Sequence, residues 1–124
     1  MDTTPLIDGR SKSLEMCKEY LGKTVSITID QAYGTTYKGI MYLANYGFVP
    51  GTTAPDGDGL DAYYLGQEKP LAEATGVCVA IIHRHEDDDD KLILVPEGAQ
   101  WSDEQIEAAV NFSEHRYVHS IVRK

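Results

Sequence analysis

Hydrophobic and polar residues alternate strictly along residues 24–29, where three β-branched apolar side chains are separated by hydroxyl side chains. A period of two predicts a strand with one buried face. Residues 76–82 and 92–95 are almost continuously apolar and rich in β-branched residues, which predicts strands buried on both faces. Residues 37–43 and 62–65 predict two shorter strands, so five strands are expected.

Two other segments have the three-to-four-residue period of helices. Residues 13–21 place apolar side chains at helical spacing after a serine, which can cap a helix N-terminus. Residues 102–117 open with Ser-Asp-Glu-Gln, a capping-box pattern, and keep one apolar face. With turn residues such as 49–52 between the strands, the pattern predicts a mainly β chain with helices (α+β). We expect a small five-stranded antiparallel barrel with a C-terminal helix packed on it, as one domain over 1–124.

The composition is that of an ordinary globular protein, with 42% hydrophobic and 25% charged residues in 124. No apolar run approaches the roughly 18 residues of a membrane span, and the first residues lack the apolar region of a signal peptide. We therefore expect a cytoplasmic protein with no membrane partner. The two cysteines, Cys17 and Cys78, lie far apart outside any metal-binding pattern, which predicts reduced core thiols.

The formal net charge of −9 limits the class of partner. A chain this acidic repels nucleic acid and anionic lipid, so neither is expected to bind. A small polyanionic substrate could bind only if metal cations bridged it to the protein. Whether such a substrate can bind therefore depends on whether the chain binds metal ions.

Acidic residues are concentrated in two short runs, DGDGLD at 56–61 and EDDDDK at 86–91. Each run alone is typical of a solvated loop. The second run, however, lies in the connection of the hairpin expected from 76–82 and 92–95. Hard divalent cations such as Mg²⁺ take carboxylate oxygens, and the glycines of the first run allow its aspartates to converge. Facing each other, the two runs would form a metal site.

Four motifs, in order, resemble the soluble family I inorganic pyrophosphatases. DGDGLD is similar to the family's D-x-D-[PE]-[hydrophobic]-D signature, and NYGF at 45–48 to the element that precedes it. The run DDKLILVP at 89–96 resembles the family's D-x-K-L-x-x-V-P, and FSEHRY at 112–117 its last helix. The resemblance implies an OB-like barrel and Mg²⁺-dependent hydrolysis of inorganic pyrophosphate to two phosphates.

The resemblance also implies roles for individual residues. The metal ligands would be Asp56, Asp61, Asp89 and, for the remaining acidic ligand, Asp87. The catalytic residues would be Asp58, which takes a proton from the attacking water, Tyr46 and Lys91. The substrate-binding residues would be Lys38, Tyr46, Lys91, Arg116 and Tyr117.

Several positions depart from the family's pattern. Gly59 takes the place of proline or glutamate, and Ser26 and Thr28 stand where the family has a lysine and a glutamate. Arg84 stands five residues before Asp89, where the family has an acidic ligand; with a shorter loop, Glu86 or Asp87 could fill that role, and Asp87 is preferred. The missing cations leave two alternatives open: a hydrolase of another phosphoanhydride or phosphate ester, or a non-catalytic metal- or phosphate-binding protein. Homo-oligomerisation is also left open.

Overall fold

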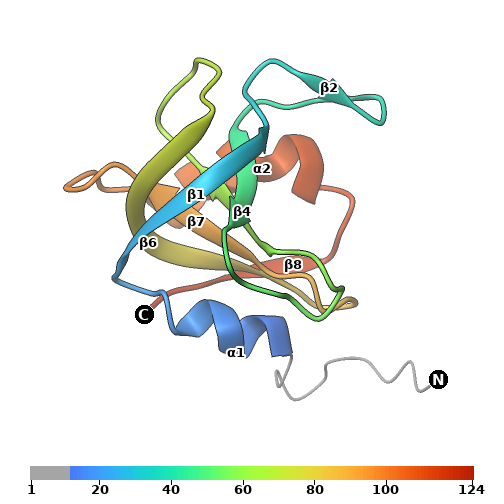
Figure 1. The fold of residues 1–124 in the computed structure, drawn as a ribbon, viewed down its shortest axis with the longest axis vertical. Helices are drawn as coiled ribbons and strands as arrows, with labels where there is room; N and C mark the ends of the chain where they lie inside the picture. Colours follow the sequence, from blue (N-terminus) through green and yellow to red (C-terminus); the bar gives the residue numbers. More distant parts are fainter. Residues whose placement is uncertain (1–11) are drawn as a thin grey trace.

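The computed structural model describes residues 12–124, and its centre is a closed barrel of five strands (Figure 1). A sixth strand pairs outside the barrel, a two-stranded hairpin projects from it, and two helices flank it. In chain order the elements are α1 (Lys12–Lys18), β1 (Thr24–Gln31), β2 (Thr36–Tyr37), β3 (Ile40–Met41), β4 (Asn45–Val49), β5 (Leu60–Tyr64), β6 (Glu73–Arg84), β7 (Lys91–Val95), α2 (Asp103–Glu114) and β8 (His119–Val122).

The barrel follows the order β1-β4-β5-β7-β6 and closes through a further pairing of β1 with β6. Four of these pairings are antiparallel, as expected. The pairing of β5 with β7 is parallel, which corrects the expectation of a wholly antiparallel barrel. The cause is the length of β6, which pairs with β1 near its start and with β7 near its end. The chain therefore returns in β7 beside β5 and runs in the same direction as β5.

Two apolar cores lie on the two sides of the barrel wall. The inner core is formed by inward residues of β1, β5, β6 and β7 together with Leu14 and Cys17 of α1. The outer core lies between the wall and α2, where Ile106 and Val110 pack on Tyr63 and its neighbours. Strands β6 and β7 contribute to both cores, which confirms the expectation that both of their faces are buried.

The structure confirms the predicted helices, although α1 begins one residue before Ser13, the expected capping residue, and ends three residues before the predicted end. Helix α2 begins after Ser102, whose side chain accepts from the Gln105 N–H while the Gln105 side chain accepts from the Ser102 N–H. It ends at Glu114, three residues before the predicted end. Helix α1 and the β2–β3 hairpin lie at opposite ends of the molecule (Figure 1).

Two strand predictions need correction. Residues 37–43 do not form one strand, because Lys38 and Gly39 both have positive φ and fold the chain into the β2–β3 hairpin outside the barrel. The barrel strand in this region is β4, the segment that contains the NYGF motif. Strand β8 was not predicted, and it extends the sheet from the end of β6.

In the part of the chain that the structure describes, no helix has the length and apolarity needed to cross a membrane. Cys17 and Cys78 are free and buried in the inner core. Burial raises the pKa of the Cys78 thiol to about 11, and it raises that of Cys17 further, so both remain protonated.

Candidate active site

A cleft of about 350 Å³ opens beside β4 and β5, between the β2–β3 hairpin and the C-terminal end of α2. Its volume is within the range of small-molecule sites. The cleft is lined by Asp30, Gln31, Tyr37, Lys38, Tyr42, Tyr46, Asp61, Tyr63, Arg84, Asp89, Lys91, Ser113, Arg116 and Tyr117.

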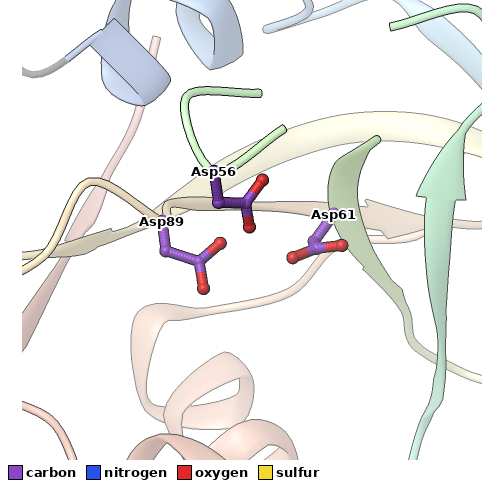
Figure 2. A group of neighbouring side chains, drawn as sticks. All are labelled: Asp56, Asp61 and Asp89. Atoms are coloured by element: carbon purple, nitrogen blue, oxygen red, sulfur yellow. The ribbon is translucent and has the colours of Figure 1, made fainter. Parts of the chain in front are cut away.

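Three carboxylates from the two acidic runs converge at this cleft (Figure 2). Asp56 lies in the turn before β5, Asp61 on β5 itself, and Asp89 just before β7. One oxygen of each lies within 4.8 Å of the others. The parallel register, in which Ala62 is opposite Leu92, places Asp61 at the same end of the sheet as Asp89. The expectation that the two acidic runs meet is therefore confirmed for these three residues.

The ammonium group of Lys91 lies between two of the three carboxylates. Its Nζ is 2.7 Å from Oδ2 of Asp61 and 2.8 Å from Oδ1 of Asp89, and the residue is only 2% exposed. Burial alone would lower the pKa of Lys91, but the two carboxylates outweigh it and raise the pKa. Burial in turn raises the pKa of Asp61, against the opposing effect of Lys91. The positive charge at Lys91 is thus permanent at neutral pH.

This donor set fits a hard divalent cation. Carboxylate oxygens are the preferred ligands of such ions, and Asp56, the outermost of the three, is exposed to solvent from which an ion could enter. The attraction that holds the Lys91 ammonium between Asp61 and Asp89 has the same electrostatic origin as the attraction these carboxylates would exert on a metal ion. The cluster can therefore bind a metal ion.

A second cation, the guanidinium of Arg84, is fixed in the cleft wall by a buried carboxylate. Its Nε and one terminal nitrogen donate to the two oxygens of Glu114 at 3.1 and 3.0 Å. Glu114 is fully buried and also accepts from the Tyr63 hydroxyl at 2.6 Å. Burial would raise the pKa of Glu114, but its bonds with Arg84 outweigh burial and lower it. Each group of this pair is thus held in its charged form.

Aromatic rings cover the floor of the cleft. Tyr46 packs against Tyr42 and Tyr63, with ring centroids 5.7 and 4.8 Å away. The Lys91 Nζ lies 5.5 Å from the Tyr46 ring centroid. Burial, together with the charge of Asp61 and a hydrogen bond to it, raises the pKa of Tyr46 well above its usual value. Tyr46 is therefore a neutral hydrogen-bond donor toward Asp61, not a phenolate base.

The aspartates of the second acidic run have separate partners. Asp88 accepts from the backbone N–H groups of Lys12 and Ser13 at the start of α1. Asp90 is buried and lies 2.9 Å from Nδ1 of His83. Asp89 alone of the run joins the carboxylate cluster.

Asp87 and Asp58 lie outside the carboxylate cluster. Asp87 was expected to be a metal ligand, but its Oδ2 faces Arg84 at 3.4 Å. Asp87 thus pairs with Arg84 outside the three converging carboxylates, and its role as a metal ligand remains a prediction. Asp58 is exposed, and its backbone N–H donates to Oδ1 of Asp56 at 2.9 Å. Its role as proton acceptor remains a prediction.

The expected substrate-binding residues all line the cleft. Lys38 lies at the rim on the exposed hairpin, with its Nζ 5.2 Å from the Tyr37 ring centroid. Arg116 is held in place by bonds of 3.1 Å to the backbone oxygen and to the side chain of Ser113. The Tyr117 ring lies against Arg84, at 3.7 Å, and Arg116, at 5.2 Å.

Sequence reasoning missed Asp30, Arg84 and Glu114. The end of β1 reaches the cleft with Asp30 and Gln31, whereas Ser26, four positions before Asp30, bonds with Thr75 and does not line the cleft. A signal for Asp30 was its place directly after the alternating strand. No local pattern could have paired Arg84 with a glutamate thirty residues later.

The comparisons agree with this geometry. The model of the family described as inorganic pyrophosphatase matches residues 10–121. The inorganic pyrophosphatase of Aeropyrum pernix is 38% identical over 64 residues, which are 48% of this chain and 36% of that protein. The match thus spans only about a third of the relative's length.

Solved structures of inorganic pyrophosphatases share the fold. The enzyme from Helicobacter pylori superposes with a TM-score of 0.64 at 19% identity, covering 82% of this chain and 85% of that one. The enzyme from Ehrlichia chaffeensis gives a TM-score of 0.62 at 19% identity, with 81% and 85% covered. These likenesses confirm the OB-like barrel with a C-terminal helix.

Proposed function

This chain belongs to the inorganic pyrophosphatase family, and we propose that it hydrolyses inorganic pyrophosphate to two phosphates with Mg²⁺ as cofactor. The observation that carries the proposal is the convergence of Asp56, Asp61 and Asp89 beside Lys91, in a cleft that also contains arginine side chains. Acidic and basic groups side by side suit a metal-bridged polyanion.

The roles of the chain's own residues follow from their positions. Asp56, Asp61 and Asp89 would hold the cation, which supplies charge neutralisation and lowers the pKa of the attacking water. Lys91 and Arg116 would bind the phosphate groups, and Tyr46 would keep Asp61 oriented through its hydroxyl.

Proton and bond changes in the reaction can be assigned as follows. The water oxygen attacks one phosphorus atom as the bond from that phosphorus to the bridging oxygen breaks. Asp58, next to Asp56 in the same turn, would take the water's proton. The leaving phosphate carries away the bonding electrons, and Lys91 stabilises the negative charge that develops on it. Lys38 and Tyr117 would complete the binding site at the rim.

A phosphate-release assay tests the proposal. The purified chain with excess Mg²⁺ is given pyrophosphate, triphosphate, ATP and p-nitrophenyl phosphate, and EDTA serves as the metal-free control. We expect release from pyrophosphate to exceed the others and to stop with EDTA. Preference for another substrate would assign a different phosphohydrolase activity. No release from any of them, with metal binding intact, would leave a metal- or phosphate-binding protein.

We include the cytoplasm and a homo-oligomeric state in the proposal. The two cysteines are free thiols, which a reducing compartment preserves. The β2–β3 hairpin and the residues after it expose Tyr37, Met41 and Leu43, which are 45%, 57% and 51% accessible. Such a group of apolar side chains favours a subunit contact. Light scattering of the wild type and of Met41→Glu would show whether the contact exists.

A further inference from the structure

Arg84 combines features that a surface arginine lacks. It is 6% exposed, its guanidinium is held in two bonds by Glu114, and its Cζ lies 3.7 Å from the Tyr117 ring centroid. Bidentate pairing and stacking leave the group little freedom. The remaining nitrogen is Nη1, and Arg84 lines the cleft.

The Nη1 nitrogen faces two carboxylates of the second acidic run. It lies 3.3 Å from Oδ2 of Asp89 and 3.4 Å from Oδ2 of Asp87. Asp89 thus has Lys91 on one oxygen and Arg84 on the other. A divalent cation placed among Asp56, Asp61 and Asp89 would meet three carboxylates and the Lys91 ammonium, whereas one placed between Asp87 and Asp89 would meet only two carboxylates and the Arg84 guanidinium.

The charge of the cleft differs from that of the chain. The chain carries a net charge of −9, but the cleft is lined by four cationic side chains and by only three carboxylates, those of Asp30, Asp61 and Asp89. The sequence led us to expect that this acidic chain binds a polyanion through metal ions, with Lys38, Lys91 and Arg116 at the phosphate groups. The structure adds Arg84 to these cations in the lining of the cleft.

We propose that the Arg84 guanidinium takes the place of a second metal ion. The cleft holds one divalent cation, on Asp56, Asp61 and Asp89, and Arg84 binds a terminal phosphate of the diphosphate through Nη1. This inference rests on the proposed function and specifies its metal stoichiometry and an additional substrate-binding residue. Glu114 is a positioning residue that fixes the direction in which the guanidinium points.

The metal stoichiometry is tested by counting ions in the wild type. Equilibrium dialysis against Mn²⁺ gives the number bound per chain, and Asp89→Asn provides the background from other acidic sites. We expect the wild type to bind one more ion than Asp89→Asn. A difference of two or more, or of zero, overturns the proposal. This count needs no change at Arg84 and no catalytic turnover.

The phosphate contact is tested by calorimetric binding of imidodiphosphate, a hydrolysis-resistant diphosphate, in EDTA. Removing Arg84 alone would leave Glu114 buried without its counter-charge, so the comparison is made between Glu114→Gln and Arg84→Met/Glu114→Gln. Glutamine at 114 can still accept from the Tyr63 hydroxyl. Arg123→Met is the matched control, because Arg123 pairs with Asp103 outside the cleft.

We expect the double variant to bind imidodiphosphate at least tenfold more weakly than Glu114→Gln, and Arg123→Met to bind like the wild type. A loss under threefold overturns the role of Arg84, and a loss above threefold supports it. Failure of the proposed function is distinguishable: a protein that binds one ion and imidodiphosphate as expected but releases no phosphate keeps this inference and loses the activity.

Discussion

The ammonium nitrogen of Lys91 lies 2.7 Å from Oδ2 of Asp61, and this contact joins the first residue of β7 to the β5 carboxylate of the carboxylate cluster. The same carboxylate is therefore available to two cations, one that belongs to the chain and one that comes from solution. Their competition makes stability depend on metal in a way that can be measured.

Lys91→Met should destabilise the fold in EDTA, and millimolar Mg²⁺ should remove much of that destabilisation. Without Lys91, Asp61 and Asp89 lack the counter-charge that binds them, which costs on the order of 2 kcal/mol for a partly buried pair. Mg²⁺ can replace it, and binding only to the folded chain adds about 2.7 kcal/mol at 100 times its Kd. Urea unfolding in both buffers measures the two values. Lys69→Met, at an exposed position, is the control.

Equal stabilisation by Mg²⁺ in Lys91→Met and wild type would show that the ammonium and the metal do not compete. The same variant should lose at least tenfold in kcat/KM for pyrophosphate, about 1.4 kcal/mol of transition-state stabilisation. A loss within threefold would make Lys91 a structural residue.

Asp61→Asn and Asp58→Asn should separate metal binding from turnover. Asp61 belongs to the converging carboxylates, so its neutralisation should weaken Mg²⁺ binding and activity together. Asp58 lies outside them, so Asp58→Asn should keep the metal affinity and lose roughly 100-fold in kcat, the usual effect of removing a proton acceptor. Calorimetry and phosphate release measure the two quantities. Equal losses of metal affinity would refute this division of roles.

Gly47→Ala should cost about 3 kcal/mol or more of the free energy of unfolding. A Cβ at Gly47 would lie 1.8 Å from the Thr28 carbonyl oxygen, so β1 would have to move away from β4. Gly98→Ala is the control, because its Cβ meets open space and only its φ of +83° opposes the change, at about 1 kcal/mol. Similar costs for both in urea unfolding would mean that the strands separate easily.

His119→Gln should lower stability more at pH 5.5 than at pH 8.5. Burial would lower the pKa of His119, but the Tyr117 carbonyl and Glu107, 2.9 Å away, outweigh it and raise the pKa. A raised folded pKa gives a contribution that is complete below the unfolded value of about 6.5 and disappears as pH rises through the folded value. We expect on the order of 0.5 kcal/mol at the lower pH.

Thermal unfolding of His119→Gln and wild type at the two pH values checks this, with the exposed His115→Gln as control. A loss that is the same at both pH values would show that the contact is a neutral hydrogen bond and not an ion pair.

The sequence was sufficient to predict a strand where buried and exposed residues alternate, and a helix where neighbouring residues cap its start. The alternation along residues 24–29 appears as alternating exposed and buried side chains in β1, and the capping box at Ser102 starts α2. Strand β4 could not be recognised in this way, because Gly47 has no side chain and Asn45 is a buried polar residue. Strand β8 has four half-buried residues and no alternation.

The candidate site was predictable where charge is concentrated and not where it is paired at long range. Asp56, Asp61 and Asp89 stand in acidic runs, and they converge. Arg84 could not be placed, because its burial depends on Glu114, which a strand, a loop and a helix bring beside it. Local sequence carries no information about such a pair.

The loop 85–90 should tolerate a substitution better than a change in its number of residues. Its neighbouring aspartates serve, in turn, the guanidinium of the cleft, the first turn of α1, the carboxylate cluster and a buried histidine. A substitution at one position removes one of these contacts and spares the other three. Deleting one aspartate instead leaves three carboxylates for four partners and shortens the connection between β6 and β7, so at least one partner loses its carboxylate and the others must be reached by a shorter loop.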